Sequence, residues 1–209
     1  MRKLLLSLII ATIFGGIATA QSTIQLPEPQ KSGGMPLMEA LAKRSTARAF
    51  STKEISNRQL SNILWAAFGI NRTDGKRTAP STMNFQGTSI YVLLKSGAYI
   101  YNEKSNSLVQ VVAEDIRELG GTQAFIKDAP VQLILVSDLS KLGKGNNEEK
   151  MNISNIDAGY ISQNIYLCCA SEGLVTGARG SVDRKALAAK LKLRQDQTVV
   201  IAHSVGFAK

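Results

Sequence analysis

The residues from Lys43 to Phe50, KRSTARAF, combine positive charge with hydroxyl groups. The arginines are Arg44 and Arg48, and the hydroxyls belong to Ser45 and Thr46. Guanidinium groups hold phosphate through bidentate, charge-assisted hydrogen bonds, while hydroxyls and free backbone amides near a helix end satisfy the remaining oxygens. The segment therefore indicates an anion site, with a phosphorylated ligand as the first candidate. On this octet alone, a solvated basic turn after a helix is the commoner arrangement.

The amino-terminal residues predict export. Arg2 and Lys3 precede an apolar run over residues 4–14, and the sequence ATA at residues 18–20 precedes Gln21, which is the layout of a signal peptide. We expect cleavage after Ala20, so that 189 residues (209 − 20) remain, enough for one domain. The run is shorter than the roughly 20 residues that a transmembrane helix needs. We therefore expect a secreted or periplasmic protein without a membrane span.

Charge and composition narrow the classes of partner. The formal net charge of +9 falls to +7 when Arg2 and Lys3 leave with the signal peptide, a balance that favours anionic ligands. The basic residues are scattered, without a dense run or an aromatic-interleaved platform, so we expect no nucleic-acid partner.

Cysteine and histidine usage excludes several kinds of chemistry. Cys168 and Cys169 are adjacent in an apolar helical context, and adjacent cysteines rarely form an unstrained disulfide. We interpret them as small buried hydrophobic residues, although a redox role stays open. His203 is the only histidine and lies in an apolar strand-like run. A structural zinc site and a Ser/His/Asp triad are therefore both improbable, and we predict no metal.

Hydrophobic periodicity and turn residues divide the mature chain into helices and strands. The expected elements are an extended arm over 21–35, a helix opened by Pro36, a helix capped by the S-x-x-Q box of Ser56 and Gln59, a polar loop over 71–86, strands over 89–95, 98–101 and 108–112, helical turns over 114–119 and 123–127, a buried strand over 131–136, an exposed loop over 141–150, a long helix over 152–172, a glycine-rich turn over 177–181, a helix from Asp183, and a closing strand over 197–207.

Strands that come first as a meander and then singly between helices predict an α+β fold with a central, mostly antiparallel mixed sheet flanked by helices. The G-x-G-x-x-G fingerprint of a dinucleotide-binding βαβ unit is missing after the first strand. Any cofactor phosphate must therefore be held by other residues, and Arg44 and Arg48 are the candidates.

Four motifs in order resemble the nitroreductase superfamily of FMN-dependent oxidoreductases over nearly all of the mature chain. The matching residues are Arg44, Thr46, Arg48 and Phe50 for R-x-[ST]-x-[RK]-x-F; Pro80, Ser81, Asn84 and Gln86 for P-S-x-x-N-x-Q; Asp157, Gly159, Gln163, Asn164 and Leu167 for D-x-G-x-x-x-Q-N-x-x-L, leading to Gly173-Leu174; and Val205, Gly206 and Phe207 for V-G-[YF]. The D-x-G helix looks most like the branch of SagB-type azoline dehydrogenases. Each motif alone is weak, but their order and spacing are specific.

The resemblance implies that residues 36–209 form an FMN-binding domain, and that two copies associate as a homodimer with FMN at the subunit interface. It implies no catalytic side chain, because the flavin carries the chemistry. Arg44 would grip the FMN phosphate with help from Ser45 and Thr46, and Arg48 would lie nearer the flavin ring. Asn84 would bond the polar edge of the ring. The remaining expected cofactor-binding residues are Pro80, Ser81, Gln86, Ala178, Arg179 and Gly180, of which the last three form the turn that presents a backbone amide to flavin N5.

Two features depart from the family pattern. Members usually continue after V-G-[YF] into a tail whose Lys or Arg completes the phosphate site, whereas this sequence ends at Lys209, which we expect to substitute. The second departure is the predicted export. The nicotinamide cofactors that normally reduce such flavins are cytoplasmic, so an exported enzyme would be separated from them. The expected function is an exported flavin oxidoreductase that exchanges hydride or electrons, by a ping-pong cycle, with a quinone, nitroaromatic or azoline-like small molecule. A flavin-binding or scaffold protein without turnover is the alternative.

Overall fold

A computed structural model describes residues 22–209, so the predicted signal peptide lies outside the described residues. The elements in chain order are β1 (Thr23–Gln25), α1 (Leu37–Lys43), α2 (Asn57–Phe68), η1 (Thr82–Asn84), β2 (Thr88–Leu94), β3 (Gly97–Asn102), β4 (Ser107–Val112), η2 (Arg117–Gly120), η3 (Ala124–Lys127), β5 (Val131–Asp138), η4 (Leu139–Lys141), α3 (Asn147–Ser171), β6 (Val175–Arg179), α4 (Arg184–Lys190) and β7 (Gln197–Gly206), where η denotes a 3-10 helix. Within this part of the chain, no helix has both the length and the apolar character that crossing a bilayer requires.

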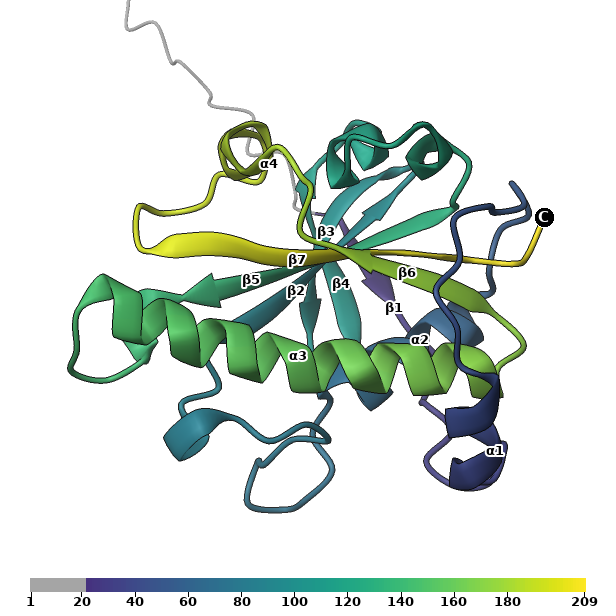
Figure 1. The fold of residues 1–209 in the computed structure, drawn as a ribbon, viewed down its shortest axis with the longest axis horizontal. Coiled ribbons are helices and arrows are strands. Elements are labelled where there is room, and N and C mark those ends of the chain that lie inside the picture. The colour runs from purple at the N-terminus through teal and green to yellow at the C-terminus, as the bar shows by residue number, and fades with distance from the viewer. Residues whose placement is uncertain (1–21) are drawn as a thin grey trace, which may run out of the picture.

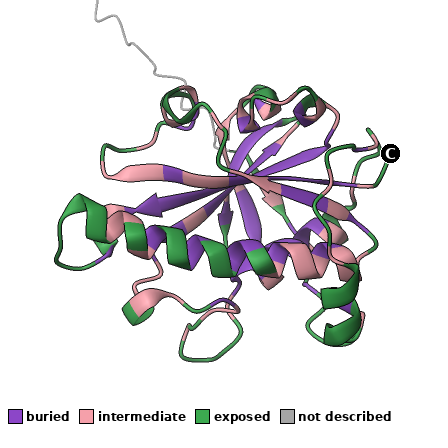
Figure 2. Ribbon diagram, viewed as in Figure 1, coloured by how far each residue is buried: buried purple, intermediate pink, exposed green. Residues whose placement is uncertain are grey.

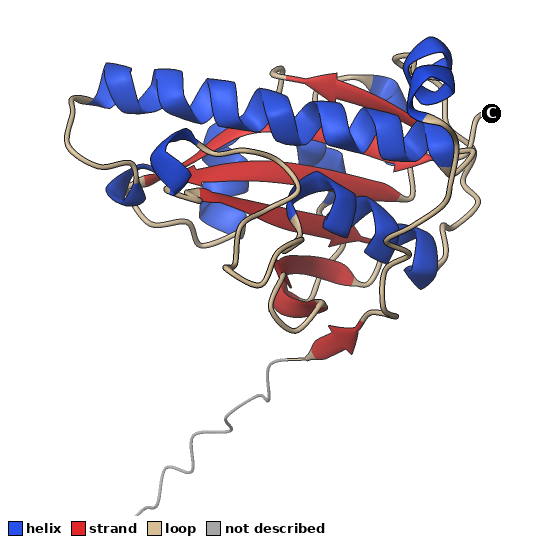
Figure 3. Ribbon diagram, turned by 90° about the horizontal axis from the view of Figure 1, so that it is seen from below, coloured by secondary structure: helices blue, strands red, loops and turns tan. Residues whose placement is uncertain are grey.

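Seven strands form one sheet in the order β1-β4-β3-β2-β5-β7-β6, and the strand pairs are all antiparallel (Figures 1 and 3). The predicted α+β fold and the meander of β2, β3 and β4 are confirmed. A parallel contact occurs only as an isolated bridge between Thr46 and Thr176 among the described residues.

Helices cover both faces of the sheet, so the protein has two cores (Figures 1 and 2). α2 and α3 pack on one face, and α4 with η2 packs on the other. Alternate residues of β2 serve the two cores, with Val92 in the first and Leu93 in the second. Every residue of β5 is buried, which explains its continuous run of branched apolar side chains.

The helix caps confirm some predictions and correct one. Ser56 and Gln59 form the predicted capping box at the start of α2, and Asp183 caps α4. α3 begins at Asn147, five residues before the predicted start, so the predicted loop over 141–150 is wrong in its second half. The reason is a second capping box, in which Asn146 accepts from the Glu149 amide at 3.0 Å and the Glu149 carboxylate accepts from the Asn146 amide at 2.9 Å.

Two other segments differ from expectation. Residues 177–179 belong to strand β6 instead of the predicted glycine-rich turn, because Gly177, Ala178 and Arg179 pair with β7. The amino-terminal arm includes β1, which pairs with β4 at the edge of the sheet, and Leu26 just beyond it is buried. The arm is thus part of the fold from Thr23 onward.

Hydrogen bonds, as well as apolar contacts, fix α3 on the sheet. Ser154 bonds Ser137 of β5 at 2.7 Å through their hydroxyls, and Ser162 bonds Nε2 of His203 in β7 at 2.8 Å. Each of these residues is buried, and a buried polar group that loses its partner costs about 1 to 3 kcal/mol. The contacts therefore set where along the sheet each turn of α3 lies.

His203 is fully buried between two hydroxyls. Besides Ser162, its Nδ1 lies 3.1 Å from Oγ1 of Thr176, and the ring of Tyr166 meets the imidazole edge-on at 5.4 Å. Burial, with a smaller contribution from the nearby charge of Arg179, lowers the pKa of His203 to about 3. The imidazole is therefore a neutral structural group.

We predict that the imidazole resonances of His203, the only histidine, do not shift between pH 8 and pH 5 in NMR spectra of tag-free protein. Below pH 6.5 the imidazole of the unfolded chain is protonated, whereas the imidazole of the native state stays neutral until the pH approaches 3. Stability should therefore fall with decreasing pH across this window, by at most about 1.4 kcal/mol per pH unit from this group. A native-state titration with a midpoint near 6.5 would show that the imidazole is accessible, contrary to this account.

Candidate functional site

The segment from Arg44 to Phe50 is bound along its length to the sheet. The Ala47 amide donates to the Thr176 carbonyl of β6 at 2.9 Å, and Phe50 pairs with Ala208 beyond β7. A Cβ added at Gly177 would lie 2.5 Å from the Ala47 carbonyl oxygen. Only glycine permits this close approach, so Gly177 is needed for docking the segment.

Tyr166 of α3 holds the first half of the segment. Its hydroxyl accepts the Ala178 amide proton at 2.9 Å and lies 3.0 Å from Oγ1 of Thr46. The Arg44 guanidinium lies over the same ring, 5.4 Å from its centroid, at cation–π distance. Within the described residues, no acidic side chain pairs with Arg44, and a space of about 190 Å³ lies beside Arg44, Ser45 and Tyr166. The half-buried Arg44 is thus placed by packing, with its charge available to an anion.

Arg48 borders a second small cavity. It is exposed, forms no ion pair or hydrogen bond with any residue from 22 to 209, and lines a space of about 160 Å³ with Thr46, Ala178 and Gln123. Oε1 of Gln123 is buried and has no hydrogen-bond partner. A buried acceptor without a donor is costly, so this cavity suits a ligand that carries a hydroxyl or an N–H group beside an anionic group.

Ala178, Arg179 and Gly180, which were predicted to form a turn, lie at the end of β6 and differ in their surroundings. The Ala178 amide is already engaged by Tyr166. The Arg179 guanidinium points inward, where Nε donates to the Gly120 carbonyl at 2.7 Å and another nitrogen bonds Gln132, and burial lowers its pKa to about 10. Gly180 is exposed, and a Cβ there would meet only the end of the Arg184 side chain, at 3.8 Å. Gly180 therefore offers the most open backbone of the three.

The loop from Pro80 to Gln86 is anchored to α3 and hydrogen-bonded internally. Asp157 accepts the Thr82 amide at 3.0 Å and the Thr82 hydroxyl at 2.9 Å. Inside the loop, the Ser81 hydroxyl accepts the Gln86 amide at 2.9 Å, and Gln86 Nε2 donates to Asn84 at 3.0 Å. Asn84 is exposed with φ of 58°. Asn tolerates this left-handed conformation better than most residues, which helps to present its amide outward.

The structure does not bring all the predicted cofactor residues together. The anion segment is bound at Tyr166, whereas the loop from Pro80 to Gln86 is bound at Asp157, nine residues or about 14 Å earlier along α3. In Figure 1 the loop lies below the middle of α3, and the anion segment lies beside its carboxyl end. The predicted cofactor residues of one chain therefore lie in two separate groups, which we call half-sites.

Lys209 is adjacent to the anion segment. Its neighbour Ala208 pairs antiparallel with Phe50, and the Ser51 amide donates to the Phe207 carbonyl at 2.9 Å. Continuation of this pairing places Lys209 on the side of Ala49 and Arg48. This position is compatible with the predicted addition of a third cation to the phosphate site.

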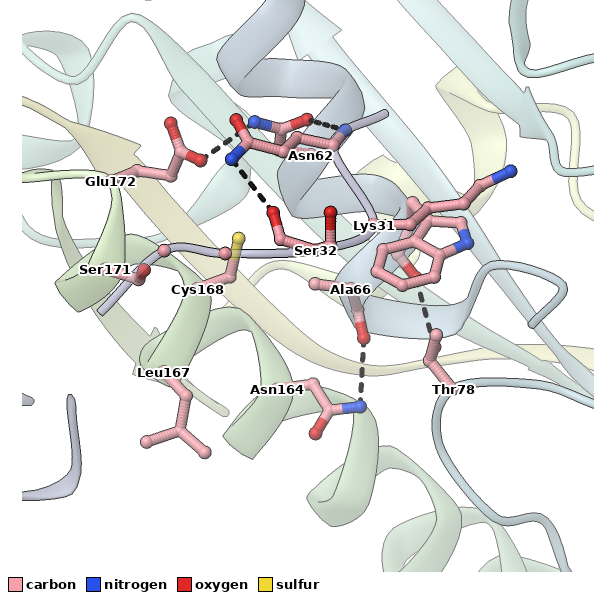
Figure 4. A pocket seen from close by; sticks show the side chains of 14 residues that line it. Lys31, Ser32, Asn62, Ala66, Thr78, Asn164, Leu167, Cys168, Ser171 and Glu172 are labelled. Atoms are coloured by element: carbon pink, nitrogen blue, oxygen red, sulfur yellow. Dashed lines mark hydrogen bonds between the residues drawn. The ribbon is translucent and has the colours of Figure 1, made fainter. Parts of the chain in front are cut away.

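Another cavity, of about 320 Å³, lies between the arm and helices α2 and α3 and contains none of the predicted cofactor residues (Figure 4). The Cys168 thiol faces it, while Cys169 is fully buried, and both are free thiols. Burial, followed by the charge of Glu172, raises the pKa of Cys168 to about 12. The thiol is therefore protonated at neutral pH and is a poor nucleophile.

Sequence reasoning missed Tyr166 and Gln123. The D-x-G helix motif passes over Tyr166 between Asn164 and Leu167, and nothing in its local pattern distinguishes it from a packing aromatic. Gln123 lies in a segment identified only as a helical turn. Its position against Arg48 depends on tertiary contacts.

We predict that Tyr166→Phe lowers the free energy of unfolding by about 1 to 3 kcal/mol, because it leaves the Ala178 amide without its acceptor. Tyr91→Phe is the matched control, since Tyr91 lies in β2 with its ring buried and its hydroxyl has no hydrogen-bond partner within the described residues. Urea unfolding followed by circular dichroism measures both. Equal stability of the two variants would show that the Tyr166 hydroxyl does not support the site.

Comparison with known proteins identifies relatives of this chain. The chain is 35% identical to a structurally characterised protein of Ralstonia eutropha JMP134, provisionally named a nitroreductase, with a TM-score of 0.86 and coverage of 92% of each chain. A protein of Methanocaldococcus jannaschii, also provisionally named a nitroreductase, is 28% identical over 182 residues, which is 82% of this chain and 90% of that relative.

A more distant likeness concerns the fold alone. The NADPH:FMN oxidoreductase of Vibrio harveyi, solved with NAD+, is 20% identical with a TM-score of 0.63, and the match covers 83% of this chain and 69% of that one. The profile of the nitroreductase family matches residues 41–207 of this protein. The chain therefore belongs to the nitroreductase family.

Proposed function

We propose that the protein is an exported FMN-dependent oxidoreductase that works as a homodimer. The observation that carries the proposal is the anion segment, where Arg44 and Arg48 have no acidic partner among the described residues and are fixed beside exposed hydroxyls. A bound phosphate would give Arg44 the charged partner that it lacks among the described residues.

The residues present fit a phosphate joined to a polyhydroxylated chain. Arg44, Ser45 and Thr46 would hold the phosphate, and Lys209 would add a cation beside it. Gln123 Oε1, the buried acceptor without a partner, would receive a ribityl hydroxyl or an N–H group. The exposed backbone at Gly180 would allow the flavin ring to approach closely.

Bound FMN would supply reversible two-electron chemistry, and the protein would supply binding, orientation and electrostatics. Arg48 would place a positive charge near the ring, where it would favour the more negative reduced form. No histidine, thiolate or carboxylate borders the cavity lined by Arg48, Gln123 and Ala178. The protein would therefore contribute no side-chain acid or base from this cavity.

A second copy of the chain would complete the site. The surface of α3 between Asp157 and Tyr166 carries exposed Tyr160, with exposed Ile156 one turn earlier, and a Cβ at Gly159 would meet nothing within 4 Å. Large exposed apolar side chains on an open helix face indicate an interface. A two-fold axis near Tyr160 would bring the Pro80–Gln86 loop of one copy to the anion segment of the other. In the complete site, Pro80, Ser81, Asn84 and Gln86 would thus act from the partner.

The proposed substrate is a small organic molecule that accepts or donates hydride, such as a quinone, a nitroaromatic or, by resemblance to the SagB-type branch, an azoline. Export would separate the enzyme from cytoplasmic NAD(P)H, so the physiological electron donor would be another compound. A non-catalytic flavin-binding protein or scaffold remains the alternative, because the anion segment explains binding and not turnover.

We predict that purified mature protein is yellow and that Arg44→Ala weakens FMN binding by about 10- to 150-fold, since a hydrogen bond to a charged group contributes about 1.5 to 3 kcal/mol. Arg58→Ala is the control, because it removes an exposed arginine at the start of α2 that lines neither of the cavities beside the anion segment. Titration of FMN fluorescence against apoprotein measures both.

Equal affinity of the two variants would contradict the phosphate assignment, and failure of the wild-type protein to take up FMN would overturn both flavin hypotheses. Turnover is tested separately under anaerobic conditions. Bleaching by dithionite followed by recovery of the yellow colour with a quinone or nitroaromatic supports the oxidoreductase. Bleaching of oxidised enzyme by a thiazoline peptide would instead identify azoline oxidation. Reduction by dithionite without reaction toward any donor or acceptor supports the binding protein.

A further inference from the structure

A separate cavity of about 350 Å³ lies between the polar loop and the sheet, and its lining includes Gln86 but not Asn84. Its charged lining residues are Arg77, Glu103, Lys104 and Lys141. Three cations against one carboxylate leave an excess of two positive charges. The volume is within the range of small-molecule sites, which begins at about 300 Å³.

Arg77 is a preformed part of this cavity, which we call the Arg77 cavity. Its side chain is 10% exposed and pairs with Glu103 at 2.6 Å. The guanidinium also donates to the Phe68 carbonyl at 3.2 Å and to Oε1 of Gln86 at 2.8 Å. A cation fixed by this many partners keeps its position when a ligand arrives, so little ordering would be needed on binding.

The two lysines complete a positive rim. Lys104 and Lys141 are exposed, and their ammonium groups form no ion pair or hydrogen bond with any side chain or backbone group in the range 22–209. They come from different parts of the chain, the turn after β3 and the 3-10 helix after β5. Two unpaired cations facing one cavity favour an anionic ligand.

Three aromatic side chains border the cavity beside its polar residues. Phe68, Phe85 and Tyr101 line the cavity, and the Arg77 guanidinium lies 5.0 Å from the centre of the Phe68 ring. The Tyr101 hydroxyl is engaged by Asn106 at 3.1 Å. Phe68 and Tyr101 are buried, and Arg77 lies over the Phe68 ring. Phe85 is therefore the aromatic side chain with the most surface left for a ligand. The lining is otherwise more polar than apolar, which suits a small polar anion.

We propose that the Arg77 cavity binds a small organic carboxylate, with the carboxylate met by Lys104 and Lys141 and any apolar part of the ligand against Phe85. The site requires no flavin and no second copy of the chain. It does touch the loop predicted to contact FMN, because Gln86 accepts from Arg77 and donates to Asn84 at 3.0 Å. Occupancy of the cavity and the position of Asn84 are thus connected through one side chain.

The test is isothermal titration of benzoate into the mature protein at low ionic strength, with benzyl alcohol and benzylamine as neutral and cationic analogues. Benzoate should bind more tightly than either analogue. The double variant Lys104→Gln/Lys141→Gln should weaken benzoate binding by about 3- to 10-fold, since exposed charge pairs contribute modestly. Glu103→Gln should strengthen it by about 2- to 5-fold, because a repelling carboxylate is lost.

Lys144→Gln is the matched control, since it removes an exposed lysine that is three residues from Lys141 and is not part of the cavity lining. It should leave benzoate binding unchanged apart from a small long-range effect. The proposal would be overturned if benzoate gave no binding heat at millimolar concentration, or if benzylamine bound as tightly as benzoate. It would also be overturned if Lys144→Gln weakened benzoate binding as much as the double variant does. FMN-free and FMN-loaded protein should both bind benzoate, so failure here is distinguishable from failure of the flavin assignment.

Discussion

The position of α3 on the sheet is the constraint on which the site depends. Apolar contacts are non-directional, whereas the bonds of Ser154 to Ser137 and Ser162 to His203 fix the helix at defined points. From that position Asp157 holds one half-site and Tyr166 holds the other. A shift of α3 would move both half-sites together.

The same constraint accounts for the neutral His203. A charged imidazole at this point would have no counter-ion and would lie near the buried Arg179, so the native state keeps it unprotonated. Neutrality lets one ring nitrogen donate and the other accept, which suits the hydroxyls of Ser162 and Thr176 on either side. The histidine therefore serves the register of the helix, and the chemistry lies elsewhere.

Much of the fold follows from local signals in the sequence. The capping box of Ser56, the apolar run of β5 and the meander around Gly97 each contain enough information to place an element. α3 begins earlier than predicted because Asn146 and Glu149 form a capping box inside a charged, glycine-containing stretch that otherwise resembles a loop. Residues 177–179 of β6 resemble a turn in the sequence because Gly177 and Gly180 flank Ala178 and Arg179, although Gly177 is required by the approach of Ala47 instead.

The candidate site is less readable from sequence than the fold. Arg44, Thr46 and Arg48 were identified from residue type and spacing, and their lack of acidic partners in the described chain agrees with a ligand role. The contributions of Tyr166 and Gln123 depend on which elements meet in space. The separation of the half-sites depends on the pitch of a helix, because nine residues of α3 place Asp157 and Tyr166 about 14 Å apart.

The central claim is that Arg44 of one chain and Asn84 of its partner serve the same FMN. The most direct test co-expresses two differently tagged chains, one with Arg44→Ala and one with Asn84→Gly, where glycine preserves the positive φ at residue 84. Each homodimer should bind FMN weakly, and the purified heterodimer should regain one site of wild-type affinity per dimer, measured by flavin absorbance. A heterodimer as weak as both parents would contradict the shared site.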